Sequence, residues 1–87
     1  MPQIIITAID ESHFQITVVG NPSTTHQVTM QPDYALKLAA GKITNTQLLE
    51  KSFAFLLERE SNTSIMPSFD LSVIARYFPE YEQIIAR

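Results

Sequence analysis

The apolar residues of this chain change their spacing near residue 31, from the period of a strand to that of a helix. Before this point, Phe14, Ile16 and Val18 alternate with polar residues, which is typical of a half-buried strand. Beyond it, one group of apolar residues falls on a single helical face: Leu71, Ile74, Ala75, Phe78. This change of period predicts an α+β fold in which the strands come first and the helices follow.

Three stretches before residue 31 have strand character: Ile4–Ile9, Phe14–Val18 and Thr25–Met30. Short polar segments with turn chemistry separate them at residues 10–13 and 20–23. Connections this short join neighbouring antiparallel strands. The sequence therefore predicts a three-stranded antiparallel β-meander.

The clearest helix start lies at Thr44, because Gln47 three residues later completes a capping box. We expect this helix to run from about Thr44 to Glu60. An earlier helix should begin at Pro32 and stop at Gly41, which tolerates the left-handed conformation.

Two further helices are expected near the C-terminus. Ser68 or Asp70 can cap the first, and Pro79 ends it or begins the second. Tyr81 and Ile84 would lie on the buried side of the second. The sequence thus predicts one α+β domain over residues 1–87, with strands at about 3–30 and three or four helices at about 32–87 packed on one face of the sheet.

Composition and charge exclude several functions. The net charge is −3 and the basic residues do not cluster, so we expect no nucleic-acid partner. The longest uninterrupted apolar run is Phe53–Leu57, far short of the roughly 20 residues that span a bilayer, so we expect no membrane partner. The chain shows no signal-peptide pattern, so we expect a cytoplasmic protein. It also lacks cysteine, which excludes disulfides and thiolate metal sites.

Residues 10–13 contain the side-chain types of a hydrolytic triad, namely Asp10, Ser12 and His13. A triad needs these groups to converge in space, whereas consecutive turn residues point in different directions. A solvated turn is therefore the better interpretation. The chain also has only two glycines, which excludes a glycine-rich phosphate loop. We expect no catalytic residue and no cofactor.

The two histidines, His13 and His26, do not suggest a metal site. If the strands around residues 20–23 form a hairpin, Val18 faces His26 and Phe14 faces Met30. His13 then lies beyond this ladder, far from His26. Because a metal site needs three or four ligands, we expect no bound metal.

The C-terminal aromatic residues offer a candidate interaction surface. Tyr77 and Tyr81 lie close in sequence to Arg76, and Tyr and Arg are favoured at interface hot spots. The alternative is that Phe69 and Phe78 belong to the core, with both tyrosines at its edge.

The first strand offers a second candidate surface. Ile4, Ile6 and Ala8 would lie on one face, with Ile5 and Ile9 on the other. In a simple meander this strand is an edge strand, and an apolar edge invites pairing with another chain. We therefore expect a homodimer, with Ile5 at its interface. The alternative is that this strand lies inside the sheet.

Two segments, Glu50–Glu60 and Ser68–Glu82, resemble part of a small bacterial protein family of unknown function. The resemblance covers about the C-terminal half. It implies short, single-domain, cytoplasmic bacterial proteins, and it implies no activity, cofactor or catalytic residue.

We therefore expect a non-enzymatic protein that acts through protein–protein interaction and self-association, with a protein partner that the sequence does not name. The alternative is a small enzyme or ligand-binding domain whose site lies between sheet and helices. A deep polar pocket would favour that alternative.

Overall fold

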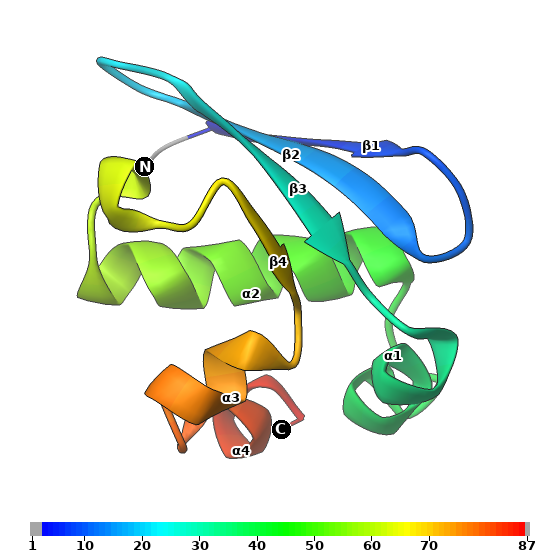
Figure 1. Ribbon diagram of the computed structural model, residues 1–87. Coiled ribbons are helices and arrows are strands. Elements are labelled where there is room, and N and C mark those ends of the chain that lie inside the picture. The colour runs from blue at the N-terminus through cyan, green and yellow to red at the C-terminus, as the bar shows by residue number, and fades with distance from the viewer. Residues whose placement is uncertain (1–2, 87) are drawn as a thin grey trace.

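The computed structural model describes residues 3–86, and its first three strands form the expected antiparallel meander (Figure 1). They are β1 (Gln3–Ala8), β2 (His13–Val19) and β3 (Thr24–Thr29). The predicted alternation is confirmed, because one side of the sheet is buried: Phe14, Ile16, Val18, His26, Val28, Met30. Residues 1, 2 and 87 of the expected domain lie outside the described residues.

A fourth strand corrects the expected sheet. β4 (Ser68–Asp70) pairs in parallel with β3, so the sheet is four-stranded and mixed, in the order β1-β2-β3-β4. The sequence predicted three antiparallel strands, and it placed the cap of a helix at Ser68 or Asp70, where β4 lies. Two backbone bonds flank this pairing: Gln27 N–H donates to the Pro67 carbonyl at 2.8 Å, and Leu71 N–H donates to the Thr29 carbonyl at 2.8 Å. β4 thereby satisfies backbone groups of β3 that a three-stranded sheet would leave open.

The register between β2 and β3 also differs from the prediction. His26 pairs with Ile16 rather than with the expected Val18. Phe14 pairs with Val28 rather than with the expected Met30. The connection spans residues 20–23, as expected, and Ser23 Oγ accepts from Gly20 N–H across it at 3.0 Å. Because the slip is by two residues, every side chain stays on its expected face.

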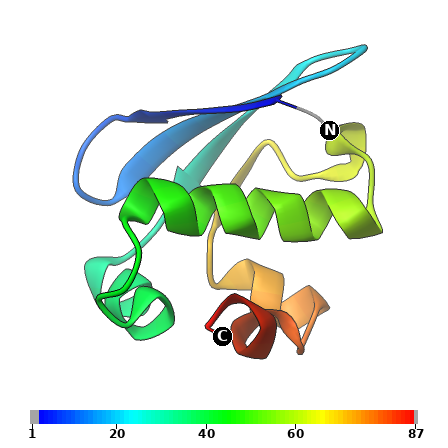
Figure 2. The ribbon, with the colours of Figure 1, turned by 180° about the vertical axis from the view of Figure 1, so that it is seen from behind.

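Four helices lie on one side of the sheet in both views of the described residues (Figures 1 and 2). They are α1 (Pro32–Ala39), α2 (Asn45–Arg59), α3 (Val73–Tyr77) and α4 (Tyr81–Ile85), and a short 3₁₀ turn, Asn62–Ser64, follows α2. α2 lies directly against the sheet, and the other helices lie on the far side of α2. Among residues 3–86, none of the helices is both long and apolar enough to cross a bilayer.

The predicted capping box of α2 is confirmed. Thr44 Oγ1 accepts from Gln47 N–H at 3.1 Å, and Gln47 Oε1 accepts from Thr44 N–H at 2.9 Å. α1 ends as expected near Gly41, whose φ is 72°, although Ala40 already takes the left-handed conformation with a φ of 51°.

α2 is buried on two sides. Its Phe53 ring packs toward the sheet, 5.6 Å from the His26 ring and 6.1 Å from the Phe69 ring. Its Phe55 ring packs toward the last two helices, 5.2 Å from the Tyr81 ring and 5.7 Å from the Phe78 ring. α2 is thus the central layer of the fold, which explains why apolar residues occupy so much of its circumference.

Candidate functional site

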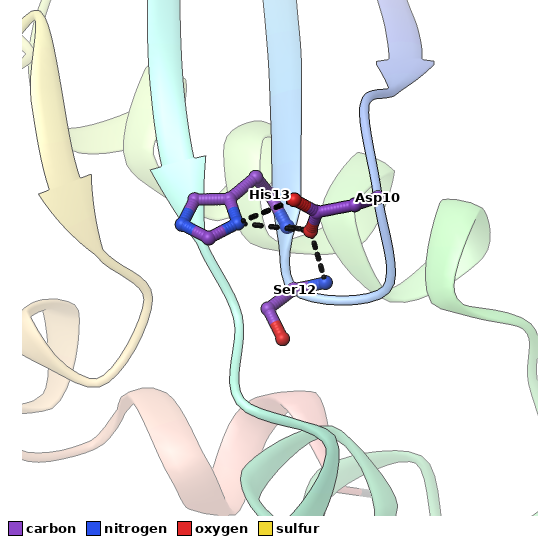
Figure 3. Close-up of polar contacts among 3 residues, drawn as sticks. All are labelled: Asp10, Ser12 and His13. Atoms are coloured by element: carbon purple, nitrogen blue, oxygen red, sulfur yellow. Dashed lines mark hydrogen bonds and ion pairs between the residues drawn. The ribbon is translucent and has the colours of Figure 1, made fainter.

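The turn between β1 and β2 is built around the carboxylate of Asp10 (Figure 3). Asp10 Oδ1 accepts from the backbone N–H groups of Ser12 at 2.8 Å and His13 at 2.9 Å, and it lies 2.8 Å from His13 Nδ1. The Ser12 backbone N–H, together with the His13 ring, holds the pKa of the Asp10 carboxyl below its ordinary value. Asp10 therefore acts as a turn-forming acceptor.

The geometry of this turn does not form a nucleophile–base pair. The Ser12 side chain points away from the His13 ring, and Ser12 contacts Asp10 through its backbone N–H (Figure 3). Asp10 and His13 are both exposed, so water reaches this hydrogen-bonded pair from several sides. The arrangement is that of a solvated turn rather than of a catalytic triad.

The two histidines lie on opposite faces of the sheet. His13 is on the open face, whereas His26 is 2% exposed and lies between the sheet and α2. Among residues 3–86, no three His, Cys, Asp or Glu side chains are grouped closely enough to hold a metal ion.

His26 has a full set of hydrogen-bond partners. Its Nδ1 lies 2.8 Å from the Met66 carbonyl oxygen, so Nδ1 carries the proton and donates there. Its Nε2 lies 2.8 Å from Thr24 Oγ1, which donates to it. Asn62 Nδ2 in turn donates to Thr24 Oγ1 at 3.1 Å and to the Pro22 carbonyl at 2.9 Å. This network ties the segment before β4 to the β2–β3 hairpin, a structural role.

The structure separates the residues proposed for an interaction surface. Ile5 is 45% exposed on the open face of β1, at the edge of the sheet. Arg76 and Tyr77 are exposed on α3, and Tyr77 is 67% exposed. Because α3 lies in the layer beyond α2, these two residues do not form one patch with Ile5 (Figure 1).

Tyr81 does not belong to any surface in this structure. Its side chain is 0% exposed, and its hydroxyl lies 2.6 Å from Ser52 Oγ on α2. The phenol ring fills the space between α2 and α4, so that a partner protein cannot reach it. The expected surface is therefore reduced to Arg76 and Tyr77, and Tyr81 is a core residue.

An apolar pocket of about 290 Å³ opens near the C-terminal end of α2. Its walls include Met66, Phe69 and Ile74, and Tyr77 also lines it. Glu60 is the one charged side chain among the residues that line it. The pocket lacks the converging Asp, His and Arg side chains that would indicate an enzyme.

β1 forms an edge of the sheet, as expected, and no described strand pairs with its outer side. Residues 3–9 carry no charge, no proline and no glycine. Ile4 and Ile6 are partly buried against the core, while Ile5 and Ile9 on the open face are exposed, Ile9 by 57%. β1 is thus apolar on both faces along an open edge.

The opposite edge of the sheet is protected. β4 has three residues, Pro67 precedes it, and the chain turns directly into α3 after it. Short edge strands and prolines are devices by which proteins prevent edge pairing. β1 has six residues and no charged side chain, so it presents the longer edge to another strand.

Sequence reasoning found Ile5 and the edge position of β1, but it missed the apolar pocket. Pocket residues Leu56, Met66 and Tyr77 come from three separate segments, and their meeting depends on β4, which the sequence did not predict. The absence of charge in residues 3–9 is a signal that could have strengthened the assignment of the edge.

Comparisons with protein-family models, with curated proteins and with solved structures found no match to this chain, so its function rests on the geometry described above.

Proposed function

We propose that this protein acts without catalysis, through protein–protein contact, and that it self-associates through the open edge of β1. The observation that carries the proposal is the unprotected edge: a six-residue strand without charge, apolar on both faces. Exposed apolar edges pair with other strands unless something blocks them. A second copy supplies an identical strand, and two-fold dimers are the commonest soluble assemblies.

Two features beside the edge support pairing between identical copies. Ile5 lies on the same face as Val19, which is 38% exposed, so edge pairing would cover apolar surface on the open face. On the other face, Ile4 borders a shallow hollow together with Glu50, Lys51 and Ala54 of α2. Glu50 and Lys51, which line this hollow, are exposed and opposite in charge.

Light scattering coupled to size exclusion tests the proposal. We expect a dimer at high micromolar concentration. Ile5→Lys should convert it to a monomer, because lysine on an edge strand opposes pairing. Thr25→Lys is the matched control: it adds the same charge on the open face of β3, away from the edge, and should leave the dimer intact.

A backbone substitution tests the same edge without adding charge. Ala8→Pro should also dissociate the dimer while the circular dichroism spectrum stays unchanged, because proline removes an N–H and blocks an edge. A monomeric parent protein would refute the proposal. A dimer that survives both Ile5→Lys and Ala8→Pro would move the interface to the Arg76–Tyr77 surface.

The apolar pocket favours a second function, the binding of a small ligand. Its lining is apolar, with Glu60 as its charged residue, and Glu60 caps the negative end of the α2 dipole. This combination suits a ligand with an apolar body and an ammonium group.

NMR titration with an arylalkylamine and with its neutral alcohol analogue tests this second function. Preference for the amine, lost in Glu60→Gln, is expected; equal or absent binding would refute this function.

A further inference from the structure

The backbone of β1 presents alternate residues to its open edge. Ile9 N–H donates to the His13 carbonyl at 2.9 Å, so residues 9 and 13 form a hydrogen-bonded pair. Hydrogen-bonded and non-hydrogen-bonded pairs alternate along an antiparallel ladder. Gln3, Ile5 and Thr7 therefore bond to β2, and the N–H and C=O groups of Ile4, Ile6 and Ala8 face outward.

The far side of β2 supports this assignment independently. Met30 N–H donates to the Ser12 carbonyl at 2.7 Å, so the even-numbered residues of β2 bond to β3. The odd-numbered residues of β2 are left to bond to β1, in agreement with the bond between Ile9 and His13.

This alternation restricts how two copies can pair. In an antiparallel two-fold pairing, outward residues must lie opposite outward residues, because only these can exchange hydrogen bonds. The axis then passes through Ile5, Ile6 or Thr7. Any position between these residues would place an outward group opposite one that is already bonded to β2.

Two of the three positions lose bonds. With the axis at Ile5, the position opposite Ala8 falls before Gln3, the first residue of β1, so Ala8 finds no partner within the strand. With the axis at Thr7, Ile4 lies opposite Asp10, whose N–H already donates to the His13 carbonyl at 3.2 Å. With the axis at Ile6, all three outward residues find partners: Ile4 opposite Ala8, Ile6 opposite Ile6, and Ala8 opposite Ile4.

The side chains fit the Ile6 position as well. On the face toward the helices, the large Ile4 lies opposite the small Ala8, and the two Ile6 side chains meet at the axis. On the open face, Ile5 lies opposite Thr7, a β-branched pair suited to cross-strand packing.

We propose that two copies of this chain join β1 to β1 in antiparallel orientation with Ile6 on the two-fold axis, so that the two sheets become one continuous sheet. This inference rests on the proposed self-association and specifies its geometry.

Cysteine cross-linking tests the register, since the chain has no native cysteine. With the axis at Ile6, residue 5 of one copy lies opposite residue 7 of the other in a non-hydrogen-bonded pair, about 4.5 Å apart at Cα. This separation permits a disulfide, whereas residues on the diagonal, at about 7–8 Å, lie too far apart. Ile5→Cys mixed with Thr7→Cys should therefore form a mixed disulfide faster than either variant forms a disulfide with itself.

The controls separate register from self-association. Thr25→Cys, on the open face away from the edge, gives the rate of random collision. Rapid self-linking of Ile5→Cys would place the axis at Ile5, and rapid self-linking of Thr7→Cys would place it at Thr7; either result overturns the proposed register and keeps the dimer. A dimer in which every pair links at the Thr25→Cys rate would overturn β1 pairing. A monomeric parent protein would overturn both proposals. The β1 edge would then be available for pairing with a strand of a different protein.

Discussion

The Tyr81 hydroxyl donates a hydrogen bond to Ser52 Oγ inside the core, at a distance of 2.6 Å. The donor is identified by the second bond of Ser52, whose single hydroxyl proton goes to the Leu48 carbonyl at 2.7 Å. Both side chains are 0% exposed. The bond joins the central helix to α4 and lets two buried hydroxyls satisfy each other.

Removing the Tyr81 hydroxyl should lower the stability less than removing the Ser52 hydroxyl does. Tyr81→Phe leaves Ser52 bonded to Leu48 and should lower the free energy of unfolding by about 1 kcal/mol. Ser52→Ala leaves the Tyr81 hydroxyl buried without an acceptor and should cost about 1–3 kcal/mol. Chemical denaturation measures both. The loss of unfolding free energy in the double variant should be smaller than the sum of the two single losses. Strict additivity would show that the bond contributes nothing. Tyr77→Phe, on the exposed α3 surface, is the control.

Stability should fall in alkaline solution. Burial raises the pKa of Tyr81 from 10.0 to about 12. Because the folded pKa exceeds the unfolded one, the stabilisation is complete below pH 10 and is lost as the pH rises through about 12. The loss from this group is on the order of 3 kcal/mol. Denaturation midpoints measured across this range should decline.

The decline should be shallower in Tyr81→Phe. A remaining decline is expected because burial, followed by the hydrogen bond to Glu82, also raises the pKa of Tyr34. Equal slopes for the parent and Tyr81→Phe would contradict the assignment to Tyr81.

The two histidines should respond differently to the same substitution. His26→Phe removes the bonds to Thr24 and Met66 and should cost about 2 kcal/mol, at about 1 kcal/mol for each bond. His13→Phe is the matched control on the open face. Asp10 keeps its bonds to the two backbone N–H groups in that variant, so the change should stay within about 0.5 kcal/mol. Thermal melts of both variants test this, and equal losses would show that the buried network adds no stability.

The capping box predicts a local effect at the start of α2. Thr44→Ala removes the acceptor for Gln47 N–H and should cost about 1 kcal/mol in chemical denaturation. Thr46→Ala lies two residues further on, exposed and outside the box, and should cost nothing. An unchanged midpoint for Thr44→Ala would mean that the cap contributes no stability.

The sequence predicted best where local signals were long or chemically specific. Alternation located the second and third strands and the face that each buries, an apolar run located the first strand, and Thr44 with Gln47 located the start of α2. β4 was not predicted because its three residues are too few to show a period, and because its pairing with β3 depends on contacts between distant segments. Such a strand is set by tertiary contacts rather than by its own propensity.

Tyr81 shows why the candidate surface was harder to predict. Sequence alone allowed this tyrosine at an interface or at the edge of the core, because Tyr suits both environments. The deciding fact is the buried Ser52 hydroxyl on α2, which provides an acceptor 29 residues away. The edge position of β1 was predicted, by contrast, because a strand's position at the end of a meander follows from chain order.

The double burial of α2 has a consequence for how the molecule opens. Amide protons in its middle turns are covered by the sheet on one side and by the later helices on the other, so they should exchange with solvent only when the entire chain unfolds. Fraying of β1 or of α4 would uncover one side of the helix and leave the other covered. The fold therefore divides into a slowly exchanging centre and independently opening margins, and β1, the proposed meeting point of two copies, belongs to the margins.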